Sequence, residues 1–172
     1  MGDREKMGLG IRLRIRYNAS KVRKARVYLD TTVPSAYVDG RAPDRMELTR
    51  RFWEERLPEL EPVVSTITLR EILDTPDEQT RASMEKLIDG FEVLDFGEEA
   101  YGLAQEYINR GVFPGRYESD ANHVAIAVVN GIGLFVSWNF RHLVKLSTRR
   151  EVNLINAIAG YQDIEILAPP EL

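Results

Sequence analysis

Three acidic side chains and one amide stand where an α/β protein usually carries its chemistry. Asp30 and Asn139 each come at the end of a predicted strand. Glu71 lies on a predicted helix, and Asp120 stands at the start of another, within the stretch YESDANHVAIAVVNG (117–131). Because ligands of open α/β sheets bind at the carboxyl ends of the strands, these four side chains are expected to converge on one edge of the sheet.

The chemistry of such a group would be that of a hard-cation site. Mg²⁺ and Mn²⁺ prefer oxygen ligands from carboxylates and water, and they bind phosphate oxygens and lower the pKa of a bound water. The chain has no cysteine and two histidines, so a thiolate or three-histidine zinc site is excluded. The predicted cofactor is therefore Mg²⁺ or Mn²⁺.

Each of these residues also has an ordinary structural explanation. Asp30 alone could be a turn or cap residue, and Glu71 could belong to a solvated helix face. Asp120 would interact favourably with the dipole of its helix without any metal, and Asn139 fits a loop. Glu118, one residue before the predicted helix, is assigned a capping or rim role.

Hydrophobic periodicity predicts strands that alternate with helices. This order is typical of an α/β fold around a central, mainly parallel sheet. The predicted strands cover residues 25–30, 61–66, 91–96, 132–138 and 163–169. Helices are predicted within residues 31–40, 43–57, 67–73, 76–90, 97–111, 119–130 and 139–161.

Length and composition fit one globular domain with an added basic segment. The 172 residues are 44% hydrophobic and 29% charged, and no apolar run is long enough to cross a membrane. The absence of cysteine fits a reducing cytoplasm. The net charge of −4 divides into +7 for residues 1–26 and −11 for the remainder. The segment 1–25 could be disordered, an added edge strand, a nucleic-acid-binding arm, or the product of an upstream start codon that the cell does not use.

Three stretches together resemble the PIN-domain family, and most of all its VapC-like ribonuclease toxins. They are VYLDTT, STITLRE and ESDANHVAIAVVNGIGLFVSWNFRHL, and the resemblance covers residues 26–168 of a predicted 26–172 domain. It implies a three-layer α/β/α fold with a central parallel sheet. It also implies Mg²⁺- or Mn²⁺-dependent cleavage of RNA in the cytoplasm by clustered acidic residues.

Carried over by position, the resemblance implies a role for each candidate residue. Asp30 and Asp120 would ligate the metal, while Glu71 would complete the metal's shell or orient the attacking water as a base. Asn139 falls where the family often has a fourth acid, and it adds no negative charge. Thr31 or Thr32 would supply the hydroxyl beside the first acid. Apart from the resemblance, Arg116, Arg141 and Lys145 flank the predicted acidic edge, where they are either phosphate contacts or ordinary solvated charges.

The resemblance also implies partners, namely a homodimer and a cognate antitoxin protein. The helix predicted at 43–57, with Phe52 and Trp53 adjacent, is expected to present apolar surface to a partner. His123 is expected to be a packed or hydrogen-bonded structural residue, and His142 an exposed loop residue.

Two other classes of function are considered. A non-catalytic PIN-like module that binds RNA or protein would also explain the loss of an acid at Asn139. Aspartyl phosphotransfer of the haloacid-dehalogenase type is disfavoured, because Thr32 stands where a second aspartate is needed.

Overall fold

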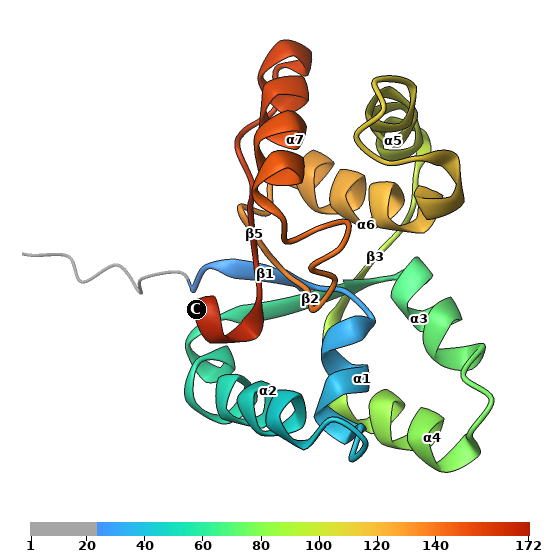
Figure 1. Cartoon of the computed structure of the whole chain (residues 1–172), viewed down its shortest axis with the longest axis vertical. Helices are drawn as coiled ribbons and strands as arrows, with labels where there is room; N and C mark the ends of the chain where they lie inside the picture. The colour runs from blue at the N-terminus through green and yellow to red at the C-terminus, as the bar shows by residue number, and fades with distance from the viewer. Residues whose placement is uncertain (1–23) are drawn as a thin grey trace, which may run out of the picture.

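Five short parallel strands form the centre of this computed structural model, which describes residues 24–172 (Figure 1). The strand order is β3-β2-β1-β4-β5, and every neighbouring pair is parallel. The strands are β1 (Arg26–Leu29), β2 (Glu61–Ser65), β3 (Glu92–Leu94), β4 (Leu134–Val136) and β5 (Glu165–Leu167). The predicted parallel sheet is thus confirmed. The prediction for segment 1–25 falls outside the described residues, apart from Lys24 and Ala25.

Seven α-helices cover the two faces of the sheet. Figure 1 shows the last three helices on one side and the first four on the other, so the predicted three-layer α/β/α arrangement is confirmed. Within residues 24–172 no helix is long and apolar enough to cross a membrane. The helices are α1 (Thr32–Val38), α2 (Pro43–Glu55), α3 (Thr66–Leu73), α4 (Glu78–Leu87), α5 (Glu98–Asn109), α6 (Glu118–Val129) and α7 (Leu146–Ala159).

Successive side chains along a strand point alternately into the two cores on opposite faces of the sheet. Tyr28 and Phe135 point into the core under α5, α6 and α7, where their rings stack with centroids 5.0 Å apart. Val27, Leu29 and Val136 point to the opposite core, under the first four helices. Because successive residues of a strand face opposite sides, a continuous apolar run is needed to fill both cores.

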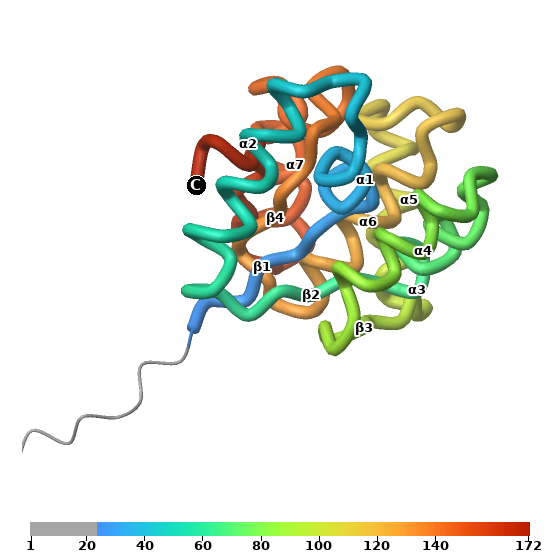
Figure 2. Tube along the Cα trace, turned by 90° about the horizontal axis from the view of Figure 1, so that it is seen from below, coloured from blue at the N-terminus to red at the C-terminus, as the bar shows by residue number. Residues whose placement is uncertain are grey.

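The sheet reverses its direction of winding at β1. The chain passes from β1 to β2 and β3 on one side, and returns to β4 and β5 on the other, as Figure 2 shows. Such a switch point opens a crevice at the carboxyl ends of the strands. Asp30 follows β1 directly and therefore lies in this crevice.

Two predicted boundaries are corrected near the crevice. A 3₁₀ turn at Gly115–Tyr117 leads directly into α6, so Glu118 lies in the first helical turn and not before it. The predicted strand 132–138 is shorter, because Trp138 leaves the ladder and donates its backbone N–H to Thr32 Oγ1 at 2.8 Å.

The expectation that Phe52 and Trp53 present apolar surface is wrong. Phe52 is 2% exposed and belongs to the core beneath the first four helices. The ring of Trp53 packs against Tyr37 at 5.4 Å and against Phe91 at 5.9 Å. Both side chains face inward because α2 packs against α1.

Replacing Gly160 with alanine is expected to lower the free energy of unfolding by about 1 kcal/mol. Gly160 ends α7 with φ +83°, in the left-handed region where a Cβ is strained even though no atom lies within 4 Å. Gly102 is the matched control, because it lies inside α5 and has equally open space. Gly102→Ala should raise stability by about 0.5–1 kcal/mol in urea denaturation. Equal effects of the two substitutions would contradict the prediction.

Candidate metal-binding and catalytic site

Asp30 is held at the end of β1 by hydroxyl groups from two neighbouring segments. Its side chain is buried, at 3% exposure. Oδ1 accepts from the backbone N–H of Thr32 at 3.0 Å and from Thr32 Oγ1 at 2.5 Å. Oδ2 accepts from Ser137 Oγ at 2.6 Å. These bonds fix both oxygens of the carboxyl group at the crevice.

Asp120 and Asn139 form a second pair on the β4 side of the crevice. The Nδ2 group of Asn139 donates to both carboxyl oxygens of Asp120, at 3.1 and 3.0 Å. Asn139 Oδ1 accepts from the backbone N–H of His142 at 3.0 Å, which fixes the orientation of the amide. In this arrangement Asn139 holds Asp120 as a hydrogen-bond donor, and its carbonyl oxygen is turned away from the acid.

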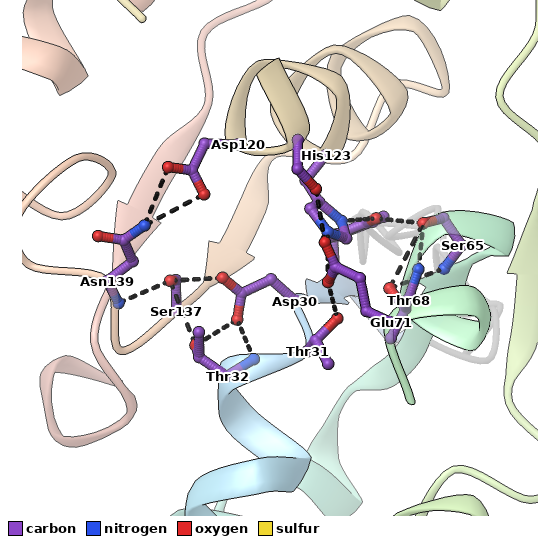
Figure 3. A network of polar contacts seen from close by, with 12 residues as sticks. Asp30, Thr31, Thr32, Ser65, Thr68, Glu71, Asp120, His123, Ser137 and Asn139 are labelled. Carbon is purple, nitrogen blue, oxygen red and sulfur yellow. Dashed lines mark hydrogen bonds and ion pairs between the residues drawn. The ribbon is translucent and has the colours of Figure 1, made fainter. Parts of the chain in front are cut away.

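The Asp30 and Asp120 carboxyl groups point into the same space (Figure 3). Burial, and next the negative charge of Asp30, raise the pKa of Asp120 to about 6. Burial also raises the pKa of Asp30, against the opposing effects of His123, Ser137 and Thr32. A buried carboxylate and a half-buried one that repel each other form a place where a cation is stabilising.

Glu71 lies at the other end of the crevice and is bound differently. Oε1 accepts from Ser119 Oγ at 2.5 Å, while Oε2 accepts from His123 Nε2 at 3.1 Å and from the Thr31 hydroxyl. Burial would raise the pKa of Glu71, but the hydrogen bonds and charge of His123, with those of Ser119 and Thr31, lower it to about 2. Glu71 is therefore an anion at every physiological pH.

The donor set fits Mg²⁺ or Mn²⁺ through two carboxylates. Within residues 24–172, no three His, Asp or Glu side chains come close enough together to form a ligand group. Asp30 and Asp120 nevertheless offer oxygen donors and unbalanced negative charge, and Mg²⁺ commonly binds one or two carboxylates while keeping several waters. The oxygens of Glu71 accept hydrogen bonds from His123, Ser119 and Thr31, and its charge contributes to the raised pKa of Asp120.

Three cations, Arg116, Arg141 and Lys145, surround His142, whose backbone binds Asn139. The ring of His142 stacks on Tyr117 at 3.6 Å, and the Arg116 guanidinium lies 4.8 Å from the centroid of the Tyr117 ring. Burial, and then the positive charges of Arg141, Lys145 and Arg116, lower the pKa of His142. The prediction that His142 is an exposed loop residue is corrected, because its side chain is half-buried within a basic patch.

Several residues of the site were missed in the sequence. Ser137 binds Asp30, and Ser119 binds Glu71, yet serines near a strand end or in a first helical turn are common and carry little signal. Tyr28 lies on β1 with its hydroxyl 2.6 Å from both Ser65 Oγ and His123 Nδ1. Because Tyr28 lies in an apolar strand, the sequence indicated a core residue and gave no sign that its hydroxyl binds His123.

The unfolding free energy of the metal-free protein should record the raised pKa of Asp120. A carboxyl group whose pKa rises on folding, from 3.8 to about 6, stabilises the protein below pH 3.8 relative to higher pH, and this contribution is lost as the pH rises through 6. Between pH 4 and pH 7.5, the stability of wild type should therefore fall relative to Asp120→Asn by on the order of 1 kcal/mol. Urea denaturation in EDTA measures the difference. Glu71, with its pKa near 2, titrates below this window. A difference that stays constant with pH would contradict the assignment.

Comparison with known proteins identifies the fold. No protein-family model and no curated protein matches the chain. A chain in the crystal structure of VapBC2 from Rickettsia felis, bound to a DNA fragment from its promoter, aligns with a TM-score of 0.51. The alignment has 12% identity and covers 83% of this chain and 98% of that chain. A chain of DNA-bound VapBC from Salmonella typhimurium aligns at 20% identity with a TM-score of 0.49, over 84% and 98% of the two chains. At such identity the first of these likenesses concerns the fold alone, and it confirms the PIN-like fold that the sequence predicted.

Proposed function

We propose that this protein is a Mg²⁺- or Mn²⁺-dependent endoribonuclease and the toxin of a toxin–antitoxin pair. The observation that carries the proposal is a pair of mutually repelling carboxylates, the buried Asp30 and the half-buried Asp120, at the switch point of a PIN-like fold. A binding surface for an anionic polymer has no use for concentrated negative charge unless a cation joins it.

In this proposal Asp30 and Asp120 hold the metal ion. Once bound, the ion would neutralise charge on the scissile phosphate and lower the pKa of a bound water. Ser137 and Thr32 keep Asp30 in place, and Asn139 keeps Asp120 in place, through the hydrogen bonds described above.

Glu71 would orient the attacking water by accepting a hydrogen bond from it. A carboxylate with a pKa of about 2 is a weak proton acceptor near neutral pH, so the orienting role is favoured over that of general base. Thr31 donates to Glu71, and Thr32 donates to Asp30, so the two hydroxyl groups serve different halves of the site.

Phosphates flanking the cleaved bond would be held by the basic patch. The patch consists of Arg116, Arg141 and Lys145, all exposed, around the stacked rings of Tyr117 and His142. Such contacts neutralise phosphate charge and weaken with salt. We expect the substrate to be cellular RNA, and the protein to act in the cytoplasm.

Partners are proposed by analogy. The fold neighbour was crystallised as VapBC2 with promoter DNA, and an antitoxin is accordingly proposed for this chain, together with a homodimer. Co-expression with a small protein encoded beside the gene, followed by gel filtration, tests both proposals.

A non-catalytic PIN-like binding module is the second candidate. It is favoured by Asn139, which adds no negative charge and occupies both oxygens of Asp120 as a hydrogen-bond donor. It is also favoured by the absence of a three-carboxylate ligand group within residues 24–172. Incubation of structured and unstructured RNAs with the protein in Mn²⁺, and separately in EDTA, distinguishes the candidates. Cleavage that needs Mn²⁺ supports the nuclease. Binding of Mn²⁺ without cleavage of any RNA favours the binding module.

A further inference from the structure

The polar network of the crevice is divided into two parts that share no hydrogen bond within residues 24–172. Figure 3 shows Asp120, Asn139, Ser137, Thr32 and Asp30 linked on one side. On the other side, Glu71 is linked to Thr31 and, through His123, to a chain of buried groups that ends at Ser65 and Thr68. The first part is where the proposed metal binds.

The chain behind Glu71 is almost completely buried. His123 is 3% exposed, and Tyr28, Ser65 and Thr68 are fully buried. His123 Nε2 lies 3.1 Å from Glu71 Oε2, and His123 Nδ1 lies 2.6 Å from Tyr28 Oη. Tyr28 Oη is also 2.6 Å from Ser65 Oγ, which caps α3 by accepting from the Thr68 backbone N–H. The imidazole therefore has a fixed partner at both nitrogens.

The hydrogen-bonding roles in this chain follow from the groups themselves. The Glu71 carboxylate can only accept, so His123 Nε2 must carry a proton and donate to it. When Nδ1 is unprotonated, the Tyr28 hydroxyl donates to Nδ1 and Ser65 donates to Tyr28. When Nδ1 is protonated, it donates to Tyr28, whose hydroxyl turns to Ser65. In both cases the Nε2–H group remains directed at Glu71.

We propose that His123 is a positioning residue, oriented by Tyr28, that keeps Glu71 bound outside the metal shell formed by Asp30 and Asp120. The proposal rests on the proposed function, and it replaces a three-acid metal site with two carboxylates for the cation and one for the attacking water. The three elements that meet here, β1, α3 and α6, set this division through packing.

A readout independent of cleavage is the Nε2 proton of His123 in NMR spectra. A buried N–H bonded to a carboxylate exchanges slowly, so we expect a downfield signal in the metal-free protein that Glu71→Gln shifts or removes. Saturating Mg²⁺ should leave this signal in place while backbone amides around Asp30 and Asp120 shift. Loss or displacement of the signal by Mg²⁺ would show that Glu71 enters the metal shell, and would overturn the proposal.

Substitutions at His123 provide the second test. His123→Phe keeps a ring in the core and removes both nitrogens, whereas His123→Gln keeps an N–H donor for Glu71. For His123→Phe we expect kcat for RNA cleavage to fall about 10- to 100-fold, with KM and the Mn²⁺ dissociation constant changed less than about twofold. His123→Gln should recover part of kcat at a similar melting temperature, and Tyr28→Phe should give a smaller loss than His123→Phe.

The outcomes separate this proposal from the proposed function. If wild type cleaves no RNA in Mn²⁺, the nuclease function fails, while the NMR signal and the Mn²⁺ affinity of His123→Phe still decide the role of His123. If cleavage is found and His123→Phe weakens Mn²⁺ binding more than about fivefold, Glu71 is a metal ligand. An unchanged kcat in His123→Phe would also overturn the positioning role.

Discussion

The Asp30→Asn variant is expected to lose Mn²⁺-dependent cleavage of RNA by at least about 10²- to 10³-fold while remaining folded. Asparagine has the shape of aspartate and keeps one oxygen to accept from Thr32. The substitution removes one of two negative charges whose mutual repulsion a bound cation would relieve. The dissociation constant for Mn²⁺, measured by electron paramagnetic resonance, should rise in parallel with the loss of activity.

Glu118→Gln is the matched control for this change. Glu118 lies two residues before Asp120 on α6, is exposed, and makes no side-chain hydrogen bond or ion pair in the described part of the chain. Its substitution alters the net charge by the same amount, so any effect of overall charge on RNA binding appears in both variants. Asp30→Asn protein that keeps full Mn²⁺-dependent cleavage, with a melting temperature equal to that of wild type, would refute the metal site.

Phe135→Ala is expected to lower the free energy of unfolding by about 3–5 kcal/mol. Phe135 is fully buried in β4, between β1 and β5, and its ring stacks on that of Tyr28 with centroids 5.0 Å apart. Removing the ring leaves a cavity that the surrounding strands can close only in part. Because Tyr28 also orients His123, the same variant should loosen the contact between His123 and Glu71.

Phe140→Ala removes the same ring from an exposed position and serves as the control. Phe140 is 56% exposed in the loop after β4, so its loss should change stability by less than about 0.5 kcal/mol. Urea denaturation followed by circular dichroism measures both variants. A loss below 1 kcal/mol for Phe135→Ala would mean that the centre of the sheet is not packed as described.

The fold class was determined by patterns that act over a few residues. Apolar runs such as that around Phe135 indicate strands buried on both faces, and the glycine after α7 ends its helix at a positive φ. Alternation of strands and helices then requires parallel pairing with helices on both faces. Errors occurred at boundaries. At Glu118 a preceding 3₁₀ turn started the helix one residue early, and at Trp138 a hydrogen bond to the distant Thr32 ended the strand.

The types and order of the candidate residues were also readable from the sequence. Asp30 after the first strand and Asp120 at the start of an apolar helix predicted carboxylates at one edge of the sheet, and the structure brings those two together. Their proximity follows from strand order, because β1 and β4 are neighbours although about a hundred residues separate them.

The partner of each carboxylate was decided only by the tertiary structure. Glu71 is bound by His123, 52 residues away, because α3 and α6 meet over the end of β1. Asn139 donates to Asp120 because the loop after β4 turns its amide, through His142, toward α6. Hydrogen-bond geometry depends on how helices pack to within a fraction of an ångström, and residue type and spacing along the chain do not specify that packing. The sequence by itself therefore determined which acids lie at this edge of the sheet, and the packing of α3, α6 and β4 decided the hydrogen-bond partners of each.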